Sequence, residues 1–310
     1  MALLVPLVAL VGPTAAGKSA LALRLAQERG GEIVSCDSLQ VYRGLDIGSA
    51  KATPQERAAV RHHLLDLVEP DQPFSAAEYA RRARAALGEV SGRGRLPILV
   101  GGTGLYLRAL LEGLFVILGP SRDEALRQRL TAIAARGGER RLHRLLGRLD
   151  PEAAARIEPR DRVRVVRAIE VFRLTGRRLS DHHRESGPGL AGFTVGLFGI
   201  APDRGALRAA VEQRTEAMLR AGLIAEARGL LARGLAPDLR PLQAIGYRQA
   251  VAVVRGDATV DQAQRDIVQT TMQYAKRQMT WFRHQADVRW FPTAEAARAG
   301  VAAWLDGERT

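Results

Sequence analysis

The chain has a single cysteine, Cys36, and three lysines, Lys18, Lys51 and Lys276, among its 310 residues. One cysteine excludes an internal disulfide and a cysteine-based zinc site, and it fits a protein of the reducing cytoplasm. No apolar run is long enough to cross a membrane. The apolar residues 1–11 lack the basic region and the cleavage site of a signal peptide, so we expect them to form a core strand.

Acidic residues are also scarce relative to basic ones, 33 against 46, which gives a formal net charge of +13. An arginine-rich genome would explain arginine in place of lysine, but not the excess of basic residues. The excess is uneven, because residues 122–184 hold 17 arginines and 9 acidic residues. A second basic cluster, at 276–283, is interleaved with aromatic residues. This pattern favours a polyanionic partner such as a nucleic acid.

One of the few lysines lies in a phosphate-binding motif. Residues 12–19 match the P-loop pattern G-x-x-x-x-G-K-S, between an apolar run (5–11) and a helical pattern (19–29). A strand, a glycine-rich turn and a helix N-terminus together direct backbone N–H groups at an anion. We expect Lys18 to neutralise phosphate oxygens and the Ser19 hydroxyl to help hold Mg²⁺. The alternative is a glycine turn with only a structural role.

The first hundred residues alternate between short apolar runs and helical patterns. The runs end at Gly12, Asp37 and Gly101, and this alternation predicts an α/β fold with a parallel sheet and helices on both faces. Ligands of such sheets collect at the carboxyl ends of the strands. We therefore expect Asp37 and Thr103 to lie near the phosphate on Lys18.

The middle of the chain has a different character. Residues 115–192 are almost entirely helical in pattern, with breaks at Gly137-Gly138, Asp150-Pro151 and Gly187-Pro188-Gly189. This predicts an all-helical insertion within a P-loop core formed by residues 1–114 and 193–310. The core should regain a strand at 193–200 and then continue in helices, which we expect at residues 203–220, 224–233, 241–255 and 260–284.

The third apolar run, residues 97–100, lacks an acidic residue at its end. Most P-loop NTPases hold magnesium with an aspartate there, whereas this run is followed by Gly101-Gly102-Thr103. No residue is obviously placed to orient an attacking water. These absences argue against a motor or switch NTPase. They leave open a transferase that uses a bound phosphate as its leaving group.

Other residues are candidates for the chemistry. Asp37 at a strand end suits a general base or a magnesium ligand, although an ordinary capped turn is the alternative. Gln40 could form paired hydrogen bonds with a base edge. The cations and aromatics of residues 276–283 suit a nucleic acid. Their alternative is an amphipathic helix with Met279 and Phe282 in the core.

Nine motifs together resemble the bacterial tRNA dimethylallyltransferase family, also called tRNA isopentenyltransferases. In chain order they are GPTAAGKS, DSLQVY, DIGSAK, HHLLD, GGTGLY, RAIEV, TG, IGYRQ and KRQMTWFR, and the resemblance extends from about Leu7 to Phe291. It implies transfer of a dimethylallyl group from its diphosphate to N6 of the adenosine adjacent to the anticodon in tRNA. Residues 115–120 and Gln243 depart from the family's usual pattern.

The resemblance also implies roles for individual residues. The catalytic residues would be Asp37 as the base, Thr103 and Arg214. The diphosphate would bind Gly12, Pro13, Thr14, Ala15, Ala16, Gly17, Lys18 and Ser19, with magnesium at Ser19. The tRNA would contact Asp37, Ser38, Leu39, Gln40, Thr103, Arg127, Val163, Arg164, Val165, Val166, Arg167, Gln243, Ala244, Ile245, Gly246, Tyr247, Arg248, Lys276, Arg277, Gln278, Met279, Thr280, Trp281, Phe282 and Arg283.

Three alternatives to this function stay open from the residues alone. They are a P-loop small-molecule kinase, a non-catalytic RNA-binding protein with a degenerate nucleotide fold, and a relative that prenylates free adenine nucleotides. The long basic segments weigh against the first and the third, and the intact Gly17-Lys18-Ser19 weighs against the second. We expect a monomer without a membrane anchor.

Overall fold

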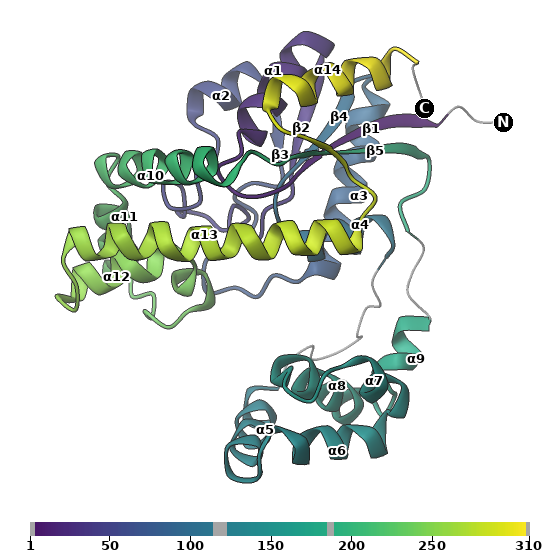
Figure 1. The fold of residues 1–310 in the computed structure, drawn as a ribbon, viewed down its shortest axis with the longest axis vertical. Helices are drawn as coiled ribbons and strands as arrows, with labels where there is room; N and C mark the ends of the chain where they lie inside the picture. The colour runs from purple at the N-terminus through teal and green to yellow at the C-terminus, as the bar shows by residue number, and fades with distance from the viewer. Residues whose placement is uncertain (1–3, 114–122, 185–188, 308–310) are drawn as a thin grey trace. The chain divides into compact units, whose positions relative to one another are not determined.

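A computed structural model of the chain describes residues 4–113, 123–184 and 189–307. Two compact units divide the chain, one of residues 1–110 and 190–310 and one of residues 111–189 (Figure 1). The expected start of the insertion at Phe115 and the expected break at Gly187-Pro188 lie outside the described residues. None of the helices in the described ranges has the length and hydropathy needed to cross a bilayer.

The larger unit is built on a parallel sheet, as predicted. Its strands in the described part of the chain are β1 (Val5–Val11), β2 (Gly31–Ser35), β3 (His62–His63), β4 (Leu96–Val100), β5 (Phe193–Ile200) and β6 (Arg289–Phe291). Their order is β3-β2-β4-β1-β5-β6, and every pairing is parallel. Strand β1 is central, so the P-loop that follows it opens at the middle of the sheet's carboxyl edge.

Helices fill the connections between these strands. Before the smaller unit they are α1 (Lys18–Arg29), α2 (Pro54–Ala59), α3 (Ala76–Gly92) and α4 (Gly104–Leu111). After it they are α10 (Arg204–Arg220), α11 (Leu223–Ala232), the 3₁₀ turn η1 (Arg240–Gln243), α12 (Tyr247–Arg255), α13 (Val260–Gln285) and α14 (Ala294–Leu305). Helix α13 begins at a capping box in which Thr259 and Gln262 satisfy each other's backbone N–H groups.

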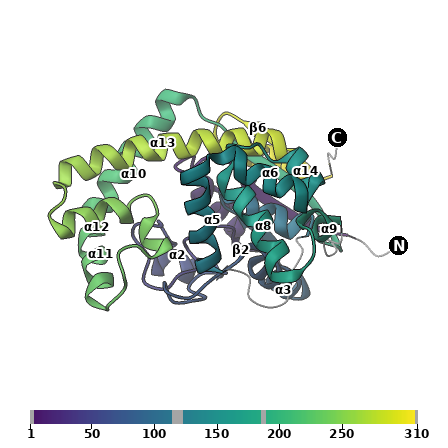
Figure 2. The same cartoon turned by 90° about the horizontal axis from the view of Figure 1, so that it is seen from below.

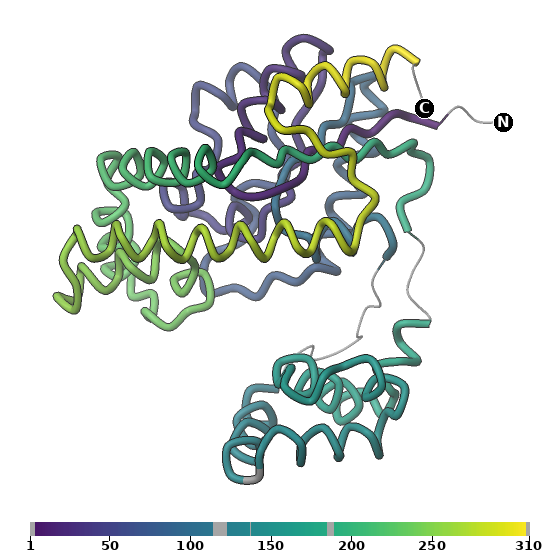
Figure 3. The backbone as a smooth tube through the Cα atoms, viewed as in Figure 1, coloured from purple at the N-terminus to yellow at the C-terminus, as the bar shows by residue number. Residues whose placement is uncertain are grey.

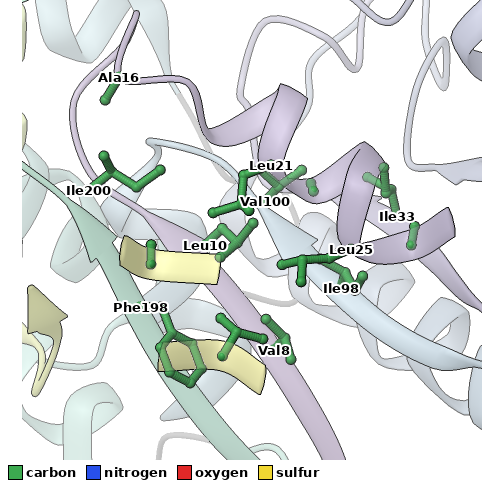
Figure 4. Packing of buried hydrophobic residues seen from close by; sticks show 14 of the residues in the cluster. Val8, Leu10, Ala16, Leu21, Leu25, Ile33, Ile98, Val100, Phe198 and Ile200 are labelled. Carbon is green, nitrogen blue, oxygen red and sulfur yellow. The ribbon is translucent and has the colours of Figure 1, made fainter. Parts of the chain in front are cut away.

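The core of the larger unit lies on both faces of the sheet. Val8 and Leu10 of β1 pack with Leu25 of α1 and Phe198 of β5 on the face that α1 and α14 cover (Figure 4). The alternating residues of β1 are buried as well, and α3 contacts β2 and β4. Leu25 is 1% exposed, so its truncation to alanine would cost about 2–5 kcal/mol. This packing on both faces fixes the positions of the carboxyl ends of the strands.

The last helices form a layer beside the carboxyl edge. Helix α13 runs alongside α10 and α12 (Figure 3). The predicted continuous helix over 241–255 is wrong, because η1 ends at Gln243 and α12 begins only at Tyr247. Gly246 between them has φ of 95°, which a helix cannot contain. The break turns α12 back along α11.

The described part of the smaller unit is helical throughout, as expected. It comprises α5 (Glu124–Gly137), α6 (Glu139–Leu149), α7 (Pro151–Arg156), α8 (Arg162–Thr175) and α9 (Leu179–Arg184). Helices α5, α6 and α8 pack against one another (Figure 2). Their apolar faces bury a separate core that includes Leu142, Leu146 and Ile169. The unit therefore has the packing of an independent helical domain.

Candidate active site

The small residues of the P-loop allow its backbone to adopt positive φ angles and to lie close to β5. Gly12 has φ of 123°, and a Cβ there would lie 2.8 Å from the Ile200 carbonyl oxygen. Ala15 and Gly17 also have positive φ, of 64° and 85°. These conformations wrap the loop around the start of α1, which begins at Lys18. The loop N–H groups and the helix dipole thus form a site for an anion.

Two cations lie at this loop, Lys18 buried and Arg214 half-buried. Lys18 is 8% exposed, and its ammonium donates to the Pro13 carbonyl at 2.6 Å. Burial, together with the charge of Arg214, lowers the pKa of Lys18 to about 7, while Asp37 opposes the shift. Arg214 reaches over from α10 and donates to the Thr14 hydroxyl at 3.0 Å, and burial lowers its pKa. A bound anion would relieve the repulsion between these two cations.

A cavity of about 340 Å³ lies in front of the cations. Its lining comes from the P-loop, from the ends of β2 and β4, and from α10 and α13. The lining residues are Thr14, Ala15, Ala16, Gly17, Lys18, Ser19, Ala20, Asp37, Gln40, Ser49, Ala50, Val100, Gly101, Gly102, Ala210, Arg214, Tyr274 and Gln278. Elements far apart in sequence therefore supply one pocket at the carboxyl edge of the sheet.

Asp37 and Thr103 lie at neighbouring strand ends, beside this cavity. Asp37 lines it, and its Oδ1 accepts the backbone N–H of Leu39 at 2.8 Å, so the capped turn offered as its alternative is also present. The Thr103 hydroxyl accepts the backbone N–H of Ser38 at 3.1 Å. The turn after β4 is thus tied to the residue that follows Asp37, which holds the carboxylate and the hydroxyl in one fixed arrangement.

The Gln40 amide is bound within the chain. Its Nε2 donates to the carbonyl oxygens of Ser49 at 3.3 Å and Ala50 at 3.2 Å, and its Oε1 accepts from the Ser35 hydroxyl at 2.8 Å. Paired hydrogen bonds to a base edge would require the amide to give these up. In this structure Gln40 fixes the loop that carries Ser49 and Ala50, and that loop forms a wall of the cavity.

That loop, residues 46–51, is braced on both sides. The Lys51 ammonium is 1% exposed, and it donates to Asp46 at 2.6 Å and to Asp66 at 2.7 Å. The Glu226 carboxylate of α11 accepts the backbone N–H groups of residues 46–48 at 2.8 to 3.2 Å. Lys51 therefore supports the cavity wall from inside the protein.

The predicted RNA contacts of the larger unit differ in their exposure to solvent. Tyr247 is fully buried and donates its hydroxyl to Glu226, while Gln278 and Phe282 are 6% and 1% exposed. Gly246 is buried, and Ser38, Leu39, Ala244, Ile245, Met279 and Trp281 range from exposed to half-buried. The exposed side chains on η1, α12 and α13 are Gln243, Arg248, Lys276, Arg277, Thr280 and Arg283. The exposed side chains on these three elements supply the cations that a large polyanionic partner could contact.

The predicted contacts in the smaller unit divide in the same way. Val163 is 78% exposed and Arg164 is exposed, whereas Val165 and Val166 belong to the unit's core. Arg127 forms two hydrogen bonds, of 2.7 and 2.8 Å, with the fully buried Glu170. Arg167 also donates to Glu170, at 2.6 Å. These ion pairs hold the pKa of Glu170 at about 2, although its burial opposes the shift.

Sequence reasoning missed one prominent cavity residue, Tyr274. Burial and the charge of Asp37 raise its pKa to about 12, so its phenol stays protonated at neutral pH. Tyr274 stands one helical turn before Gln278, and both line the cavity. That spacing was the available signal, since residues four apart share a face of a helix.

The side chains at the cavity suit a magnesium ion that is held mainly by the phosphate oxygens of a bound substrate. In the described residues, no group of three or more His, Cys, Asp or Glu side chains is arranged to hold a metal. The cavity offers the Ser19 hydroxyl at the first turn of α1 and the Asp37 carboxylate. Mg²⁺ commonly takes few protein ligands and fills its shell with phosphate oxygens and water. Burial raises the pKa of Cys36 to about 12, which removes it as a thiolate ligand.

The fold and the site together define a P-loop protein whose anion pocket faces a carboxylate. A sequence model described as IPP transferase matches residues 40–285. A curated relative named tRNA dimethylallyltransferase 2, from Geotalea uraniireducens, is 46% identical over 94% of both chains. Another, named tRNA dimethylallyltransferase, from Halorhodospira halophila, is 47% identical over 97% of both. The chain belongs to the IPP transferase family.

Solved structures agree with this assignment. The full-length tRNA isopentenylpyrophosphate transferase of Bacillus halodurans is 39% identical, with a TM-score of 0.69 over 98% of this chain and 96% of that one. A eukaryotic dimethylallyltransferase acting on tRNA is 24% identical with a TM-score of 0.76, which shows a shared fold. The resemblance drawn from the nine motifs is confirmed.

Proposed function

We propose that this protein transfers a dimethylallyl group from dimethylallyl diphosphate to N6 of the adenosine adjacent to the anticodon in tRNA and releases diphosphate. The observation that carries this is the cavity, where Lys18 and Arg214 stand at the P-loop and Asp37 lines the same space. Membership of the IPP transferase family supports it. Such a pocket suits the departure of an anion with proton removal from a nucleophile nearby.

The diphosphate of the donor binds to the P-loop. Lys18, Arg214 and the loop N–H groups neutralise the charge that grows on the leaving oxygen as the C–O bond breaks. The allylic carbon tolerates this because its positive charge is delocalised. The electron pair of the broken bond leaves with the diphosphate. Thr103, whose hydroxyl accepts the Ser38 N–H, is proposed from its motif to hydrogen-bond near the breaking C–O bond.

Asp37 serves as the base. The adenine amine is scarcely basic, so its N6 proton leaves only as the new C–N bond forms, and a carboxylate placed beside it can accept that proton. The Leu39 N–H holds the carboxyl in place. The adenine must leave its stack in the RNA to reach this depth, at a cost that is smallest for a loop nucleotide.

Magnesium, when bound at Ser19 and the diphosphate, adds charge neutralisation to the leaving group. The oxygen donors that the cavity offers for this ion are the Ser19 hydroxyl and the Asp37 carboxylate. So small a set fits an ion that keeps most of its ligands as phosphate oxygens and water.

The exposed cations provide the grip on RNA. Lys276, Arg277 and Arg283 project from α13, and Arg248 from α12. Arg164 and Val163 are exposed on the smaller unit. Arg127 and Arg167 belong to the proposed RNA surface of the smaller unit, with their guanidinium groups oriented by Glu170. The net charge of +13 suits a polyanionic substrate of this size.

One experiment tests this function. The purified protein is incubated with labelled dimethylallyl diphosphate and magnesium, and either tRNA or free AMP is the acceptor. We expect label in the tRNA at the adenosine adjacent to the anticodon, and none in AMP. Label in AMP alone would reveal an adenylate-prenylating enzyme. In a parallel incubation with ATP and no RNA, turnover of ATP would reveal a kinase.

A further inference from the structure

Gln278 connects two loops that both belong to the active site. Its Oε1 accepts the backbone N–H of Thr14 in the P-loop at 2.9 Å. Its Nε2 donates to the Gly102 carbonyl, in the turn after β4, at 2.9 Å. The side chain is 6% exposed, so these bonds form away from bulk water, where leaving either partner unpaired is costly. One amide thus fixes the P-loop relative to the turn that carries Thr103.

The glycines of that turn leave room for α13. A Cβ at Gly102 would lie 2.1 Å from Nε2 of Gln278. A Cβ at Gly104 would lie 2.3 Å from the indole ring of Trp281. Gln278 and Trp281 are three residues apart, so they leave α13 on the same face and enclose the Thr103 turn. These two glycines therefore allow α13 to lie close against the turn.

The same stretch of α13 carries cations on its other side. Lys276, Arg277 and Arg283 are exposed, and the guanidinium of Arg277 stands 5.7 Å from the ring centre of Tyr274, which lines the cavity. Residues between 274 and 283 thus contact the diphosphate pocket with one face and offer charge to solvent with the other. A ligand that restrains the outer face also restrains the inner one.

We propose that Gln278 is a positioning residue that couples the two substrate sites, so that RNA bound by α13 tightens the P-loop around the diphosphate. This inference rests on the proposed function. The coupling is reciprocal, because RNA can strengthen diphosphate binding only by the factor by which diphosphate strengthens RNA binding. The Gln278 amide is the connection through which that factor is transmitted to Thr14 and to the Thr103 turn.

Two substitutions break the bridge from opposite ends. Gln278→Met keeps the shape of the side chain and removes both hydrogen bonds. Gly102→Ala keeps the sequence of α13 and of the P-loop, and its methyl group displaces the amide. Gln273→Met is the matched control, since Gln273 is exposed on the same helix. Calorimetry gives the Kd of pyrophosphate with magnesium, alone and with saturating anticodon stem-loop RNA.

In the unsubstituted protein we expect RNA to tighten pyrophosphate binding about tenfold, within the usual range of coupling. The Gln273→Met protein should keep this ratio. Both bridge variants should lower it to within about twofold of one, because neither keeps the amide between the P-loop and the Thr103 turn. Should Gln278→Met fail to fold, Gly102→Ala provides the same comparison.

A ratio near one in the unsubstituted protein, or a bridge variant that keeps the full ratio, overturns the inference. Prenyl transfer by the same unsubstituted preparation separates the two proposals. Labelled tRNA without coupling removes the role of Gln278 and leaves the function intact. Absence of labelled tRNA removes the function itself.

Discussion

Lys18 makes a specific prediction about pH, because its surroundings lower its pKa to about 7. Burial and the charge of Arg214 cause the shift, and a diphosphate in the cavity would reverse it by adding negative charge beside the ammonium. The ligand binds the protonated lysine, so binding above pH 7 draws a proton from solution. The contribution of Lys18 to affinity is therefore flat below about pH 6 and falls as the pH rises through 7.

The magnitude follows from the pKa. With a value of about 7, roughly nine-tenths of Lys18 is neutral at pH 8, so binding takes up about 0.9 proton. If the bound lysine stays charged to pH 9, the Lys18 contribution alone weakens the Kd for pyrophosphate about 50-fold between pH 7 and pH 9, relative to the Lys18→Arg protein. Tyr274 adds nothing over this range, because its pKa is raised to about 12.

Calorimetry in two buffers of different ionisation enthalpy measures the proton uptake directly. Lys18→Arg is the control, because a guanidinium stays charged throughout, so subtracting its uptake removes the ionisation of pyrophosphate itself. We expect the unsubstituted protein to exceed the variant by about 0.9 proton at pH 8 and by about 0.1 at pH 6. Equal uptake by the two proteins at pH 8 would refute the reasoning.

Three further predictions follow from the site and its supports. Asp37→Ala should lower the single-turnover rate of prenyl transfer about 10²-fold or more while donor affinity is retained, as measured by rapid quench. Gly48→Ala should cost about 1–3 kcal/mol in urea unfolding, since its Cβ would lie 2.5 Å from the buried Tyr247 ring; Gly88→Ala is its control, with nothing within 4 Å. RNA affinity should fall with salt, with a log–log slope of about −2 or steeper if the three exposed cations of α13 contact phosphates.

Each of these has an outcome that contradicts it. An Asp37→Ala protein with a near-normal single-turnover rate would remove Asp37 as the base. Equal stability of the Gly48 and Gly88 variants would mean that the Tyr247 contact is looser than the structure has it. RNA binding that is independent of salt would exclude the basic surfaces as the RNA site.

Local signals predicted the elements that surround the P-loop. The strand at 193–200 has the bounds found for β5, and the strand, turn and helix around Lys18 are as expected. These segments are long, or carry glycines at positions of positive φ. Strands β3 and β6 were not foreseen, because two and three residues carry no period. The break at Gly246 was missed because helical spacing resumes after it.

The site could be predicted where a motif directly follows a strand. It was harder to predict where the packing of helices determines the direction of a side chain. Asp37 lines the cavity with Lys18, as parallel-strand topology required. Arg214 reaches it too, yet only the resemblance singled it out among many arginines. The inward direction of Gln278 and Tyr247 was not visible, since a residue list does not say which face of a helix another element covers. Gln40 likewise found its partners in a loop whose path no local pattern specifies.

The ends of the smaller unit lie against each other. A Cβ at Gly189 would be 2.2 Å from the carbonyl oxygen of Leu111, so the segment leaves and rejoins the main chain at one point. Insertion of a domain is best tolerated where its termini are adjacent, because the host need not deform to admit it. Residues between these two points can therefore change in length and charge among relatives without altering the register of β1 and β5. The enzyme can thus vary its helical module while keeping one catalytic frame.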